Sequence, residues 1–239
     1  MFKSIVFIQI KNEHIMKKIF TACIILIGFN AFAQRIVEKE MGAFHEIKVY
    51  DLIEVNLIKS DENKVLLKGQ NVDDINLVNK NGVLKIKMEL DKIFHGEDTF
   101  VEVYYTSLDL IDGNEGARIT SNETIEQNTI ELKTQEGAQI KVGLAVDYLT
   151  VRAVTGGIID ASGLAKNQEV VLNTGGIFEG RDLRTETTKV KITAAGEAEV
   201  FASLRVDISI KAGGDVDVYG NPEKVNKNTF AGGRVRVME

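Results

Sequence analysis

Residues 155–180 read TGGIIDASGLAKNQEVVLNTGGIFEG, and in this stretch Thr-Gly-Gly, two apolar residues and a carboxylate occur twice, nineteen residues apart. The same phrase recurs in weaker form through NEGARI (114–119), QEGAQI (135–140), VTGGII (154–159), NTGGIF (173–178), TAAGEA (193–198), KAGGDV (211–216) and FAGGRV (230–235). The fourth residue of each copy serves as an anchor: Ala117, Ala138, Gly157, Gly176, Gly196, Gly214 and Gly233. Successive anchors are 21, 19, 19, 20, 18 and 19 residues apart. Internal repeats of this length are typical of solenoid architectures.

Apolar residues recur at fixed distances from these anchors. Six positions before them the residue is apolar in every copy except the last, where Lys227 stands. Two positions after them stand Ile119, Ile140, Ile159, Phe178, Ala198, Val216 and Val235. Around both positions apolar and polar residues alternate, which is the period of a β-strand. Each unit therefore predicts a strand, a tight glycine corner, a second strand and a polar return.

A unit of about twenty residues cannot bury its own apolar face, but stacked units form a continuous core. We therefore predict an all-β fold, a single-stranded β-helix (β-solenoid) with coils of about 19–20 residues, regular over 103–239. Parallel crossovers make a right-handed helix the expected one. A β-sandwich with similarly spaced hairpins is the alternative. The recurrence of residue types in register over six periods favours the solenoid.

The segment 34–102 is less regular, and we expect it to form N-terminal coils and a cap on the same 34–239 domain. Asn81-Gly82 lies between two alternating arms and predicts a two-residue hairpin. A cap is expected because an open solenoid end exposes unpaired strand edges.

The first 33 residues have the features of an export signal. Lys17-Lys18 precede the apolar run from Ile19 to Phe29, and Ala31-Phe32-Ala33 matches a cleavage site. We expect residues 1–33 to be a signal peptide, with 1–15 an upstream extension before Met16 and the mature chain beginning at Gln34. The apolar run is too short for a permanent transmembrane anchor. The expected location is the periplasm, the outer-membrane surface or the extracellular space.

Composition excludes several classes of function. Residues 1–33 hold four lysines and one glutamate, so their removal changes the net charge from −6 to −9. Such an acidic chain is not expected to bind nucleic acid. Cys23 is the single cysteine and lies in the signal, so the mature chain has no disulfide. His45 and His95 do not form a Cys/His metal motif.

Two rows of charged residues are candidate binding sites. Three positions after successive anchors stand Asp160, Glu179, Glu199 and Asp217, which strand alternation turns outward as an acidic ladder. The ladder is a candidate site for calcium or a cationic ligand, or else a solvated face; no cofactor is assigned, because a flat ladder lacks the converging cage that calcium requires. Five positions before the anchors stand Lys133, Arg152 and Lys191. This basic row could recognise an acidic glycan, or else serve solubility.

Stacked-coil folds also include carbohydrate-active enzymes. Asp215 with Asp217, or Glu197 with Glu199, would fall on one strand face, as hydrolysis requires. Alternation supplies such pairs by chance in any acidic strand, and the chain has no Trp for a carbohydrate platform. We assign no catalytic residue and expect the protein not to be an enzyme.

The pattern resembles a known family, the head GIN domain family ("putative auto-transporter adhesin"), a domain of unknown function common in exported proteins of Bacteroidetes. The resemblance covers about 42–237 and rests on GAFHEIKVYDLIEVNLIKSDENKVLLKG, NGVLKIKM and the tandem units TGGIIDASGL and VLNTGGIFEG. It implies a right-handed β-helix and a role at the cell surface.

These observations lead to one main hypothesis: an exported, non-enzymatic, adhesin-like solenoid that presents flat β-faces to a surface glycan or protein. Two alternatives stay open. One is a carbohydrate-active enzyme. The other is a periplasmic scaffold that associates only with its own copies, as a homo-oligomer through the solenoid ends, where the strand RVRVME (234–239) is the candidate edge.

Overall fold

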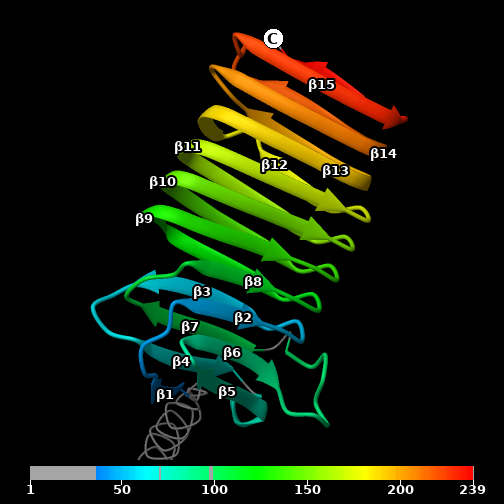
Figure 1. The fold of residues 1–239 in the computed structure, drawn as a ribbon. Coiled ribbons are helices and arrows are strands. Elements are labelled where there is room, and N and C mark those ends of the chain that lie inside the picture. Colours follow the sequence, from blue (N-terminus) through cyan, green and yellow to red (C-terminus); the bar gives the residue numbers. More distant parts are fainter. Residues whose placement is uncertain (1–35, 70, 97–98, 239) are drawn as a thin grey trace, which may run out of the picture. The chain divides into compact units, whose positions relative to one another are not determined.

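The computed structural model describes residues 36–69, 71–96 and 99–238. The predicted signal peptide lies outside these ranges. Within them 72% of the residues lie in β-strands, and the coils stack as a β-solenoid of about seven turns, which confirms the predicted fold class (Figure 1). The strands are β1 (Ile36–Glu40), β2 (Glu46–Val49), β3 (Glu54–Lys59), β4 (Lys64–Gly69), β5 (Ile75–Lys80), β6 (Val83–Met88), β7 (Thr99–Tyr105), β8 (Leu110–Gly113), β9 (Arg118–Thr134), β10 (Gln139–Val154), β11 (Ile158–Asn173), β12 (Ile177–Gly180), β13 (Leu183–Phe201), β14 (Arg205–Tyr219), β15 (Lys224–Ala231) and β16 (Arg234–Val237).

From β8 onward the coils pair in parallel, each with the next along the chain, in the register that the repeat predicts. Figure 1 shows these strands rising in sequence order from green to red. The residues two positions after the anchors lie directly opposite one another from coil to coil: Ile119, Ile140, Ile159, Phe178, Ala198, Val216 and Val235. The first six are buried. This column is the centre of one continuous apolar core.

The glycine corners have two separate causes. In the corner at 155–157, Thr155 and Gly156 have φ values of 49° and 72°, so the chain turns through the left-handed region. Gly157 follows, and a Cβ there would lie 2.6 Å from Thr134 Oγ1 and 2.7 Å from the Thr134 backbone. The second glycine therefore serves close approach between coils rather than the turn itself.

The N-terminal segment departs from sequence order. Strand β2 lies between β6 and β8, and β3 lies between β7 and β9, so the coil of residues 46–59 is stacked between the coil of residues 83–105 and the coil that begins with β8. Three antiparallel pairings occur at this end: β1 with β4, β4 with β7, and β5 with β6. The β5–β6 turn uses Asn81 and Gly82 at φ 55° and 79°, which confirms the predicted hairpin. A 3-10 turn covers Val72–Asp74.

The opposite end is formed by β15 and β16, which both pair with β14. Lys227 lies opposite Ile208, at a register position that is apolar in the preceding coils. A charged residue at an inward position disfavours pairing with a further strand. No helix in the described part of the chain is both long and apolar enough to cross a membrane.

Candidate functional site

The acidic ladder exists as a row of directly opposed residues. Asp160 of β11, Glu179 of β12, Glu199 of β13 and Asp217 of β14 follow one another in register. A cation closes each end of the row. Lys141 Nζ lies 2.7 Å from Asp160 Oδ2, and Arg236 donates to both carboxylate oxygens of Asp217, at 2.5 and 2.7 Å.

A second acidic row runs beside the ladder. Glu197 lies opposite Asp215, and Asp215 accepts two hydrogen bonds from Arg234, at 3.2 and 2.9 Å. This hydrogen bonding with Arg234 lowers the pKa of Asp215, and the hydrogen bond with Asp160 raises the pKa of Lys141. A hollow of about 180 Å³ lies between the two rows. Among the described residues no three His, Cys, Asp or Glu side chains form a group that could hold a metal ion. The ladder is therefore a row whose ends are neutralised within the chain.

The basic row is likewise paired with carboxylates of the same sheet face. Glu131 lies 3.2 Å from Lys133 and 3.1 Å from Arg152, on neighbouring coils. Lys191 lies 2.6 Å from Glu169, and the hydrogen bond between them raises the pKa of Lys191 and lowers that of Glu169. These three cations thus occupy the expected positions and already have anionic partners.

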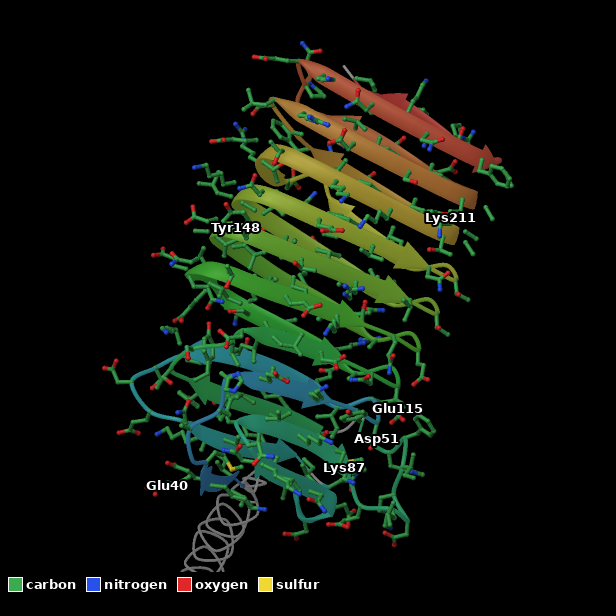
Figure 2. All side chains as sticks on the ribbon, viewed as in Figure 1. Glu40, Asp51, Lys87, Glu115, Tyr148 and Lys211 are labelled. Carbon is green, nitrogen blue, oxygen red and sulfur yellow. The ribbon has the colours of Figure 1, made fainter. Side chains whose placement is uncertain are left out.

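One carboxylate is buried near the N-terminal coils. Asp51 is 4% exposed, and its carboxylate accepts hydrogen bonds from the backbone N–H groups of Met88 at 3.0 Å and Phe94 at 3.4 Å. Glu115 lies beside it (Figure 2). Burial, followed by the hydrogen bond and charge of Asp51, raises the pKa of Glu115. The backbone contacts of Asp51 give this pair a structural role in closing the turn.

A different surface combines aromatic rings with cations, and sequence reasoning missed it. Phe201 ends β13 and Tyr219 ends β14, and the two residues lie opposite each other in the parallel ladder. Arg181 lies in the turn between β12 and β13, and Arg184 is the second residue of β13. The guanidinium carbon of Arg181 lies 4.7 Å from the centre of the Tyr219 ring, and that of Arg184 lies 5.8 Å from the centre of the Phe201 ring. Both separations are within the range of cation–π interactions.

Two hollows meet at this surface, and they share Arg184 and Phe201. One of about 400 Å³ is lined by Arg181, Asp182, Arg184, Phe201, Tyr219, Gly220 and Met238. The other, of about 540 Å³, is lined by Val146, Leu164, Ala165, Lys166, Arg184, Thr185, Glu186, Phe201 and Ser203. We call this combined surface the arginine–aromatic groove. Leu164 is 58% exposed within it, so the groove offers an apolar wall as well as rings and charges.

The charges of the groove differ from those of the rest of the chain. Of the seven arginines in the described ranges, five have a carboxylate within ion-pair distance: Arg118, Arg152, Arg205, Arg234 and Arg236. Arg181 and Arg184, the other two arginines in these ranges, contact aromatic rings instead. Their in-plane N–H donors are consequently available to a ligand.

A signal for this groove was present in the sequence. Arg181, Phe201, Tyr219 and Met238 each stand five positions after an anchor, at Gly176, Gly196, Gly214 and Gly233. They form one row, just as the ladder and core residues do. Met238 joins it through its N–H, which donates to the Val218 carbonyl at 2.8 Å.

The chain matches one family model over residues 43–222, described as "Putative auto-transporter adhesin, head GIN domain". It is similar to a solved structure described as a putative adhesin from Bacteroides fragilis, at 13% identity and a TM-score of 0.79, covering 86% of this chain and 97% of that one. A putative adhesin from Parabacteroides distasonis has 20% identity and a TM-score of 0.72, with the same coverage of both chains.

A protein from Parabacteroides distasonis described as a putative lipid binding protein has 15% identity and a TM-score of 0.66, again covering 86% of this chain and 97% of that one. None of the curated proteins compared with the chain matches it. At these identities the solved structures show the fold alone.

Proposed function

The chain belongs to the head GIN domain family of "putative auto-transporter adhesins", and from this premise we propose that it is an exported, non-enzymatic binding protein that attaches to a surface glycan or protein through the arginine–aromatic groove. The family description supports a role at the cell surface. The groove supplies the place where a partner binds.

One observation carries the choice of site. On the two flat faces the candidate cations and several carboxylates are already paired with each other, as with Lys191 and Glu169 or Arg236 and Asp217. Binding there would first have to break those pairs. Within the described part of the chain, Arg181 and Arg184 have no such ion pair to break, and Phe201 and Tyr219 supply ring surface beside them. Ligand sites usually combine such an apolar surface with a few convergent polar groups.

The same pairing supports a non-enzymatic role. A glycoside hydrolase needs one carboxyl group with a raised pKa to act as the acid. Asp215 and Asp217 form a two-residue pair on one strand face, yet each accepts two hydrogen bonds from an arginine, and these lower the pKa of Asp215. A carboxylate held in this way is a poor proton donor at neutral pH.

The test is binding of the fluorescently labelled chain to an array of surface glycans and to intact bacterial and epithelial cells. We expect saturable binding that weakens at least tenfold in the Phe201→Ala/Tyr219→Ala double variant. Phe230→Ala is the matched control, because Phe230 is 91% exposed on the last coil and lies outside the groove. Saturable binding that survives the double variant, or turnover of a bound polysaccharide, would contradict the proposal.

A further inference from the structure

The arginine–aromatic groove also indicates the chemical class of its ligand. We infer that Arg181 and Arg184 act as a clamp for a carboxylate carried on a sugar ring, so that the ligand is an acidic saccharide; this inference rests on the proposed binding function.

The two guanidinium groups can bind an anion without leaving their aromatic rings. A guanidinium interacts with an aromatic ring through the ring face, while its five N–H donors lie in its own plane. Arg181 and Arg184 therefore can keep their contacts with Tyr219 and Phe201 and still donate to an anion. The rings hold both side chains in place before binding, so less conformational entropy is lost when a ligand arrives.

The charges that line the groove favour an anionic ligand. Arg181, Arg184 and Lys166 face the groove against Asp182 and Glu186, which leaves a net positive charge there. The chain as a whole is negative, with a formal charge of −6. A local positive site on an acidic protein selects an anionic ligand over a cationic one. The planar guanidinium fork matches a carboxylate, to which it can donate two parallel hydrogen bonds.

The remaining surface of the groove fits a sugar ring. Phe201 and Tyr219 lie one above the other on adjacent coils, which are about 4.8 Å apart. Their ring faces carry partial negative charge and accept the C–H bonds of a sugar ring. Asp182, which lines the groove, supplies an acceptor for sugar hydroxyl groups. An extended lipid tail could contact the rings but would leave Asp182 and the in-plane N–H donors of Arg181 and Arg184 without partners, so a saccharide fits better than a lipid tail.

Gly220 contributes to this arrangement. A Cβ at position 220 would lie 2.7 Å from Cε1 and 2.8 Å from Cζ of Phe201. The absence of a side chain there lets the Phe201 ring occupy its position between Arg184 and the next coil. The groove thus depends on one residue from the turn after β14 as well as on β13.

The experiment compares saccharides that differ only in the charged group. Glucuronate- and galacturonate-containing oligosaccharides, sialylated and sulfated oligosaccharides, and the carboxyl-reduced form of each carboxylated one are titrated against the purified chain by calorimetry and on an array. We expect at least one carboxylated saccharide to bind at least tenfold more tightly than its reduced form, and this preference to weaken as salt rises. Arg181→Gln/Arg184→Gln should abolish the preference, and Arg181→Lys/Arg184→Lys should restore only part of it.

Arg118→Gln is the matched control, because Arg118 is 62% exposed and pairs with Glu54 at 3.7 Å, away from the groove. Equal binding of carboxylated and reduced saccharides, lost in Phe201→Ala/Tyr219→Ala, would overturn the clamp and leave the proposed function standing. Arginine-dependent binding of anionic lipid vesicles or of an acidic peptide, without saccharide binding, would refute the inference that the ligand is a saccharide. Failure to bind any array glycan or cell surface would overturn both proposals. Circular dichroism of each variant separates these outcomes from a failure to fold.

Discussion

Replacing Gly180 by alanine tests the packing that defines the solenoid core. A Cβ at this position would lie 2.2 Å from Cε1 and 2.5 Å from Cζ of Phe178, and 3.0 Å from the Glu199 carbonyl oxygen. Gly180 is not among the residues with positive φ, so alanine can adopt its backbone conformation. The expected cost is therefore steric and falls on the Phe178 ring, which is fully buried.

The magnitude follows from two opposing effects. Overpacking a core costs about 1–3 kcal/mol, whereas the reduced entropy of the unfolded chain returns about 0.4–1 kcal/mol. Gly180→Ala should therefore lower the free energy of unfolding by roughly 1–2 kcal/mol. Phe178→Leu alone should also destabilise, by less than the 3–5 kcal/mol of a Phe→Ala change. In the double variant the leucine makes room for the new methyl group. The loss of unfolding free energy in the double variant should therefore be smaller than the sum of the two single losses by about 1 kcal/mol or more.

Urea denaturation followed by circular dichroism measures these free energies. The variants are compared only where their m-values equal that of the unmodified chain, because stacked coils can unfold in parts and an altered m-value indicates such partial unfolding. Gly156→Ala is the control: a Cβ there would meet nothing within 4 Å, but φ is +72°. Its loss of about 1 kcal/mol comes from the backbone, so it should simply add to that of Phe178→Leu. If Gly180→Ala and Phe178→Leu also add within about 0.5 kcal/mol, Phe178 does not occupy the space above Gly180.

Two further predictions concern the carboxylates. Burial and the neighbouring Asp51 raise the pKa of Glu115 in the folded state above its ordinary value, so between the unfolded-state and folded-state pKa values the native state binds more protons than the unfolded state. The contribution of Glu115 to stability should be complete below the unfolded-state pKa and lost as pH rises through the folded-state pKa. In urea titrations at a series of pH values, Glu115→Gln should reduce this loss of stability. A pH profile that Glu115→Gln leaves unchanged would contradict the prediction. Glu199 stands between Glu179 and Asp217, so Glu199→Gln should stabilise the chain by about 0.5 kcal/mol at low salt, with the gain disappearing near 0.5 M salt. Asp160→Asn, which loses the contact with Lys141, is its control, and equal effects of the two changes would argue against repulsion along the ladder.

The repeat predicts the core well because each coil meets the same physical requirement. Ile140, Ile159 and Phe178 are apolar for one reason, which is that each lies above the previous one and away from water. The order of the N-terminal coils could not be predicted in this way. The strands at 46–49 and 83–88 are both short and alternating, and no local feature of the sequence indicates that the first lies between the second and β8. That placement depends on contacts between segments far apart in the chain.

The charged rows show the limit of reading positions without partners. Lys133, Arg152 and Lys191 lie where the spacing places them, yet their carboxylate partners stand two positions earlier on the strand of the same or the neighbouring coil. Long side chains on adjacent coils reach one another, so a row of like charges in the sequence says little about the field at the surface. A row must be considered together with its flanking rows before it is treated as a site.

The same reasoning could have found the groove. The anchors on either side of Arg181, Gly176 and Gly196, are 20 residues apart, and Gly196 and Gly214 are 18 apart. Most other successive anchors are 19 residues apart. The extra residue falls at Arg181 and Asp182, where the chain makes a turn and β12 separates from β13. A solenoid that keeps its register presents long, nearly flat faces, and a local departure from that register opens additional space between neighbouring coils. The position where the spacing changes, beside a row with two aromatic residues, is therefore where a ligand site is physically easiest to build.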